Sequence, residues 1–162
     1  MIKISALAIL AALSISALSA SHLLAQSAPA APGNPAQGCT LRIHIDGLRN
    51  SKGNIGTVLF TSPNGWPEDL GKTFRHGPAP IAPGERRGTA IWENIPPGDY
   101  GIAAIHDENS NHHLDRNFIG IPKEGFGFAN NPHVGLSAPA FKLAIVHVQC
   151  PVTDTTIHLQ HK

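Results

Sequence analysis

Short stretches in which apolar and polar residues alternate recur along most of the chain, and a period of two is typical of β-strands that bury one face. The clearest stretch is residues 41–46, which a turn-rich segment (RNSKGN) follows. One short helix is expected around residues 67–72, where Glu68 and Asp69 would lie in the first turn. The predicted strands are residues 41–46, 55–61, 89–94, 99–106, 141–149 and 155–159, with an additional short strand within 74–82.

Six or seven strands without a long helical period predict a single all-β domain. We expect two antiparallel sheets packed as a sandwich of the prealbumin or immunoglobulin-like Greek-key type. The composition agrees, because 16 glycines and 14 prolines among 162 residues supply many turns, and an apolar content of 41% argues against disorder.

The charge of the chain excludes some classes of partner. The formal net charge is +1, so the chain has no global attraction to nucleic acid or to an anionic membrane. Arg86 and Arg87 form an isolated basic pair rather than a basic stripe, and we therefore predict no nucleic-acid binding.

The first 25 residues predict export. They begin with a single basic residue, Lys3, and continue as an apolar and small-residue run, and no acidic residue precedes Asp46. These features are typical of a secretory signal peptide, and an uncleaved membrane anchor is the alternative. Residues 26–38 (QSAPAAPGNPAQG) form a Pro/Ala-rich spacer, and residues 39–162 are the predicted domain. No later apolar run is long enough to span a bilayer, so we expect a mature protein without a transmembrane segment, in the periplasm or outside the cell.

Two cysteines bracket the predicted domain. Cys39 lies on the apolar side of the first strand, with Leu41, and Cys150 lies on the same side of its segment as Val148. In an exported protein an even number of cysteines indicates a disulfide. We therefore predict a structural Cys39–Cys150 bridge rather than a reactive thiol beside His147.

The segment HDENSNHHLD contains the oxygen-ligand spacing of a calcium loop. Asp107, Asn109, Asn111 and Asp115 occupy positions 1, 3, 5 and 9 of that pattern, and the carbonyl of His113 falls at position 7. Such a loop turns alternate side chains inward around a hard cation. A Ca²⁺ site here is expected to bind on the order of 0.1–1 mM, the range of extracellular modules.

Two positions depart from the calcium pattern. Position 6, which is normally glycine, is His112, and position 12, normally a bidentate glutamate, is Phe118. A final ligand would have to come from elsewhere, such as Glu108 or Glu124. The alternative interpretation is a loop of Asx-turns, in which Asn and Asp side chains bond to the loop's own backbone.

The same region offers a second chemical hypothesis. His106, Asp107 and Asp115 could form a transition-metal site or the centre of a small metal-dependent enzyme. No nucleophile elbow, phosphate-binding loop or dinucleotide-binding fingerprint accompanies them, so catalysis has little other support.

Two phenylalanines stand in the glycine-rich stretch GFGFANN. Phe126 and Phe128 either form part of an apolar surface for a ligand or partner, or plug the end of the sandwich beneath the long loop of residues 114–139.

Residues 96–131, which include HDENSNHHLD and GIPKEGFGFANN, resemble the DUF2141 family of small exported bacterial proteins. That family carries an HDxNxN…LD segment followed by G-x-P-x-E-G-[YF]-x-F-[SA]-N-N, and the likeness extends over about residues 41–158. The chain departs from the family pattern at His112 and His113, where glycine and a polar residue are usual. The resemblance implies a secreted β-sandwich and does not imply an activity.

Together these observations favour an exported, non-enzymatic binding or envelope-associated module, with an envelope protein or a small ligand as its partner. In this hypothesis the loop of residues 107–115, with or without Ca²⁺ as its only cofactor, orders a long loop that faces the ligand. The alternative is a small periplasmic metal-handling protein or metal-dependent enzyme that uses the His106/Asp107/Asp115 cluster.

Overall fold

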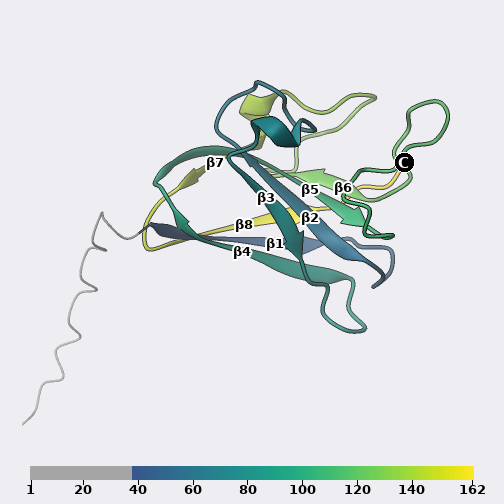
Figure 1. The fold of residues 1–162 in the computed structure, drawn as a ribbon, viewed down its shortest axis with the longest axis horizontal. Coiled ribbons are helices and arrows are strands. Elements are labelled where there is room, and N and C mark those ends of the chain that lie inside the picture. Colours follow the sequence, from purple (N-terminus) through teal and green to yellow (C-terminus); the bar gives the residue numbers. More distant parts are fainter. Residues whose placement is uncertain (1–37) are drawn as a thin grey trace, which may run out of the picture. The chain divides into compact units, whose positions relative to one another are not determined.

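The computed structural model describes residues 38–162, in which β-strands form most of the regular structure (Figure 1). The predicted signal peptide and nearly all of the predicted spacer, residues 1–37, lie outside the described residues. Within the described part, no helix has the length and apolar character needed to cross a membrane.

Eight strands and two short 3-10 helices follow one another within residues 38–162, where six or seven strands were expected. In order they are β1 (Cys39–Asp46), β2 (Asn54–Phe60), η1 (Leu70–Lys72), β3 (Arg75–Ala79), β4 (Arg87–Ile95), β5 (Gly98–Asp107), β6 (Phe126–Phe128), η2 (Phe141–Ala144), β7 (Ile145–Val148) and β8 (Val152–His158). The predicted helix near residue 70 is therefore a single 3-10 turn, and the first half of the strand predicted at 141–149 is helical.

The strands form two sheets, as expected for a sandwich. One sheet has the order β4-β1-β8, and the other has the order β3-β2-β5-β6, with β7 also paired to β5. β7 and β6 share one edge of β5, because β7 pairs with residues 98–101 and β6 pairs with residues 103–105. Figure 1 shows the three-stranded sheet on one side of the five-stranded sheet.

One strand pair corrects the expectation of purely antiparallel sheets: β1 and β8 are parallel, with Ile43 opposite Thr155. β8 follows β7 after only three residues, but β7 belongs to the other sheet. A chain that crosses between sheets is not constrained by hairpin geometry, so the direction of β8 beside β1 was not determined by the turn that precedes it.

The main core lies between the two sheets and has the parity that the sequence predicted. In β1, Leu41, Ile43 and Ile45 are buried, whereas the intervening Arg42 and His44 are exposed. Apolar side chains from the facing strands complete this core, among them Ile55, Leu59, Ile95, Ile102, Val148 and Ile157.

Strand β5 is buried on both of its faces. Tyr100, Ile102 and Ala104 face the core between the sheets, whereas Ala103 belongs to a second apolar cluster on the outer face of the five-stranded sheet. The second cluster is important because it forms the floor of the candidate site.

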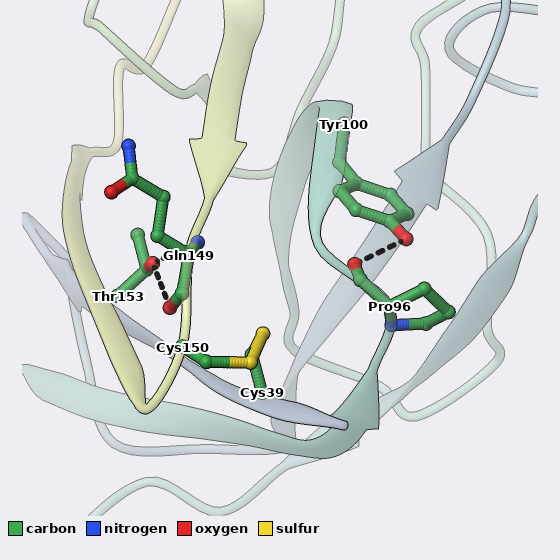
Figure 2. Close-up of a disulfide and its surroundings, with 6 residues drawn as sticks. All are labelled: Cys39, Pro96, Tyr100, Gln149, Cys150 and Thr153. Carbon is green, nitrogen blue, oxygen red and sulfur yellow. Dashed lines mark hydrogen bonds between the residues drawn. A yellow bond between two sulfur atoms is a disulfide. The ribbon is translucent and has the colours of Figure 1, made fainter. Parts of the chain in front are cut away.

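A disulfide joins Cys39 at the start of β1 to Cys150 just after β7, which confirms the predicted pairing (Figure 2). Cys39 is fully buried, and the bridge connects the three-stranded sheet to the end of the five-stranded one. Such bridges persist in oxidising compartments.

Replacing both cysteines by alanine should lower the free energy of unfolding by about 4–5 kcal/mol, because the bridge closes a loop with a sequence separation of 111 residues. Urea denaturation of the double variant and of the oxidised protein measures the difference. In the presence of a reductant the two proteins should unfold at similar urea concentrations. A difference below about 1 kcal/mol without reductant would contradict a stabilising role.

Tyr100 fixes the turn that precedes β5, since its hydroxyl donates a hydrogen bond of 2.9 Å to the carbonyl oxygen of Pro96 (Figure 2). Burial raises the pKa of the Tyr100 phenol, and the nearby positive charge of Arg75 opposes this only in part. The native state therefore favours the neutral phenol more than the unfolded state does.

Tyr100 should contribute its full stabilisation below the pKa of an unfolded tyrosine, about 10, and lose it as the pH rises further. Tyr100→Phe should cost about 1 kcal/mol at neutral pH and should weaken the alkaline loss of stability. Urea denaturation between about pH 8 and about pH 11 tests both. Because Tyr100 is the only tyrosine, the ultraviolet absorbance of its phenolate reports the ionisation directly, and titration in the native protein below pH 10 would contradict the prediction.

Candidate functional site

The loop after β5 begins at a buried carboxylate. The side chain of Asp107 is almost inaccessible to solvent, and its two oxygens accept hydrogen bonds from the backbone N–H groups of Asn111 (3.0 Å) and His112 (2.8 Å). Ser110 and His112 have positive φ angles of 59° and 65°, which tighten the turn around this carboxylate. Asp107 therefore holds the first half of the loop in a closed turn.

The other predicted ligands come together in the same loop. The carboxylate of Asp115 accepts hydrogen bonds from the side-chain amides of Asn109 (2.9 Å) and Asn111 (3.0 Å). The side-chain oxygen of Asn109 accepts the backbone N–H of Asn111 at 3.1 Å, and that of Asn111 accepts the backbone N–H of His113 at 2.9 Å. These are the bonds of Asx-turns.

Glu124, named from the sequence only as a candidate final ligand, closes the loop. Its side chain is buried, and its two oxygens accept the backbone N–H groups of Glu108 (2.9 Å) and Asp115 (3.0 Å). One carboxylate thus joins the two ends of the loop to the segment that precedes β6. Among residues 38–162, no group of three or more histidine, cysteine or acidic side chains is arranged to hold a metal ion.

Glu108 ties this loop to the loop that follows β1. Its carboxylate accepts hydrogen bonds from Arg49 Nε (2.7 Å) and Asn50 Nδ2 (2.8 Å). Burial raises the pKa of Glu108, but the bonds to Arg49 and Asn50 and the positive charge of Arg49 outweigh burial, so the pKa lies below its ordinary value. The carboxylate is therefore held in its charged form.

His106 does not share a site with the neighbouring aspartates. Adjacent residues of a strand point to opposite faces, so His106 faces the interior, where it is fully buried, and Asp107 faces the outer side of the sheet. The His106 Nε2 lies 2.9 Å from the carbonyl oxygen of Lys52, which can only accept, so this nitrogen carries the proton. The hypothesis of a His106/Asp107/Asp115 cluster is not supported by this arrangement.

A large open groove lies on the outer face of the five-stranded sheet, and sequence reasoning missed it. Its volume is about 1300 Å³. Two rows of side chains, each crossing four strands in register, form its floor. One row is His76, Val58, Ala103 and Phe128, and the other is Pro78, Gly56, Ile105 and Phe126.

The floor forms a trough whose residues differ in size across the sheet. Gly56 and Ala103 lie on the two central strands with Val58 and Ile105, whereas the phenylalanines lie on the edge strand β6. A Cβ atom at Gly56 would lie only 3.0 Å from the side chain of Ile105, so glycine makes room for that side chain in the floor. Phe126 and Phe128 are 7% and 5% exposed. Of the two interpretations from the sequence, an apolar surface for a ligand and a buried plug, the burial agrees with close packing: pairing with β5 places both residues in the sheet, as part of the floor.

Aromatic side chains close one end of the trough. Trp66 packs against Phe60, Phe128 and Phe141, with ring centroids 5.5–5.7 Å apart. The indole Nε1 donates a hydrogen bond of 2.9 Å to the carbonyl oxygen of Pro139, which fixes the ring in place. The loop of residues 107–115 borders the other end, where His112, His113 and Leu114 line the groove.

The walls are formed by two further loops, residues 116–125 before β6 and residues 129–140 after it, and both carry exposed apolar side chains. Ile119 and Leu136 line the groove and are 64% and 106% exposed. Figure 1 shows these loops on the side of the five-stranded sheet that faces away from the three-stranded sheet. The sequence did contain a signal for this groove, because both faces of β5 are apolar. If its outer face were exposed to water, polar residues would be expected at Ala103 and Ile105.

Asp107→Ala should lower the free energy of unfolding by about 2–4 kcal/mol, because two backbone N–H groups lose their acceptor. Asp115→Ala is the matched control and should cost less than about 1 kcal/mol, since its partners are exposed side-chain amides. Urea denaturation in excess Ca²⁺ and in a chelator measures both, and we expect equal losses in the two conditions. A stabilisation by Ca²⁺ but not by Mg²⁺ that Asp107→Asn/Asp115→Asn abolishes would instead establish the cation loop.

Comparison with known proteins identifies a family. A family model described as "Uncharacterized protein conserved in bacteria (DUF2141)" matches residues 43–156. Neither the curated proteins nor the solved structures contain a significant match to the chain. The matched segment makes up more than half of the chain and spans β1 to β8, including the loop of residues 107–115 and the floor of the groove. This agrees with the resemblance of residues 96–131, and the chain belongs to the DUF2141 family.

Proposed function

We propose that this protein is a binding module that holds an elongated apolar ligand in the groove on the outer face of the five-stranded sheet. The observation that carries the proposal is the trough itself, in which apolar side chains from four strands lie at the bottom of a groove of about 1300 Å³. Typical small-molecule pockets measure roughly 300–1,000 Å³, so the groove has room for a long ligand.

The way in which the walls are held favours a pre-formed binding site. The aromatic cluster around Trp66 and the hydrogen-bonded loop of residues 107–115 border the ends of the trough, and both are held by bonds within the protein. A site that does not have to order its walls on binding loses less free energy. In this proposal the loop predicted as a calcium site acts as a rigid wall.

The proposal includes export. The Cys39–Cys150 bridge favours an oxidising compartment, which agrees with the secretory signal peptide predicted at residues 1–25. We favour a binding module over the alternative of a metal-handling protein or metal-dependent enzyme, because His106 is buried away from the groove and the carboxylates of Asp107 and Asp115 are bonded to their own loop.

A neutral apolar fluorescent dye, N-phenyl-1-naphthylamine, should bind to the groove with an increase in its fluorescence. The double variant Ile119→Ser/Leu136→Ser should bind the dye roughly tenfold more weakly, because it removes apolar contacts from both walls. Both side chains are exposed, so the variant should retain the stability of the parent protein in urea denaturation.

The matched control is Ile91→Ser/Leu143→Ser, which also removes two exposed apolar side chains but none that lines the groove. It should bind the dye as the parent does. Absence of dye binding, or equal losses in the two double variants, would contradict the proposal.

A further inference from the structure

Groups that attract anions dominate the polar lining of the groove. Four of the ten histidines line it, together with one arginine and one lysine, whereas the carboxylates among its lining residues are Glu68 and Asp107. The basic and imidazole side chains are His76, His112, His113, Arg116, His133 and Lys162.

Both carboxylates are already engaged. Glu68 accepts a hydrogen bond from the guanidinium of Arg116, and the two charges form an ion pair. Asp107 is buried, accepts two backbone N–H groups, and has the Nδ1 of the His112 ring 3.8 Å from one of its oxygens. The charge of Glu68 is therefore paired with that of Arg116, and the buried Asp107 is not available to a cationic group of a ligand.

Several of the basic groups are not neutralised in the same way. In the described part of the chain, the imidazoles of His113 and His133 form no hydrogen bond or ion pair, and Lys162 forms no ion pair. The ammonium of Lys162 donates a hydrogen bond of 2.9 Å to the carbonyl oxygen of Val134, the residue next to His133. This bond holds the positive charge at the wall of the groove.

We infer that the ligand of the groove is a long-chain carboxylate of the fatty-acid class. Its hydrocarbon chain lies along the trough, and its carboxylate accepts hydrogen bonds from His113, His133 and Lys162. This inference rests on the proposed function and adds the charge of the ligand. Charge complementarity carries it, because an apolar floor combined with unneutralised donors fits an amphiphile with an anionic head.

Calorimetric titration of the disulfide-bonded protein with three ligands of equal chain length, dodecanoate, dodecanol and dodecylammonium, tests the inference. The two ions are used below their micelle concentrations and dodecanol below its solubility. Dodecanoate should bind about fivefold more tightly than dodecanol, and dodecylammonium should bind most weakly. His113→Gln/His133→Gln/Lys162→Met should remove the preference for dodecanoate and leave the affinity for dodecanol unchanged. The control His44→Gln/His147→Gln replaces two exposed histidines that do not line the groove, and it should keep the preference.

The outcomes separate the inference from the proposed function. If dodecanol binds as tightly as dodecanoate, or if the triple variant retains the preference, the inference is wrong and the groove remains an apolar site. If none of the three ligands binds, the proposed function itself fails.

Discussion

The burial of β5 on both faces is the constraint on which the rest of the structure depends. One face closes the core between the sheets, and the other forms the centre of the groove floor. A strand without a solvated face can carry polar side chains only where they have partners. At its end, Asp107 meets this condition through two loop N–H groups, and His106 meets it at Nε2 through the carbonyl of Lys52, while its buried Nδ1 has no hydrogen-bond partner. The same constraint thus explains the core, the groove and the turn that borders it.

Much of the fold could be predicted because most strands bury one face, and alternation is then visible in a single strand. β1 is the clearest case, and its parity also placed Cys39 in the core. β6 could not be predicted from alternation, since three residues, Phe126–Phe128, are too few to show a period and the strand exists through pairing with β5. The parallel pairing of β8 with β1 depends on a crossing between sheets, which no local pattern encodes.

For the candidate site, spacing identified the residues of one loop but not their roles. An aspartate oxygen that binds a cation and one that accepts a backbone N–H occur at the same spacing, so Asp107 and Asp115 satisfied both interpretations. Glu124 closes the loop at a sequence separation of nine residues from Asp115, beyond the range of a local pattern. The groove was less visible still, because its floor combines residues from four strands and appears only when their register is known.

An open apolar trough exposes apolar surface to water, which is unfavourable. The walls would therefore close over the trough unless the structure prevented it. Here the shape of the floor and the anchoring of its ends provide that resistance. Ala103 is small at the centre of the floor, while the indole of Trp66 is fixed by the carbonyl of Pro139 at one end and the turn around Asp107 is fixed at the other. In the proposed function, a chain-like ligand would remove the apolar floor from water without moving either end. The hydrogen bonds of the loop would then act on binding through the wall that they hold.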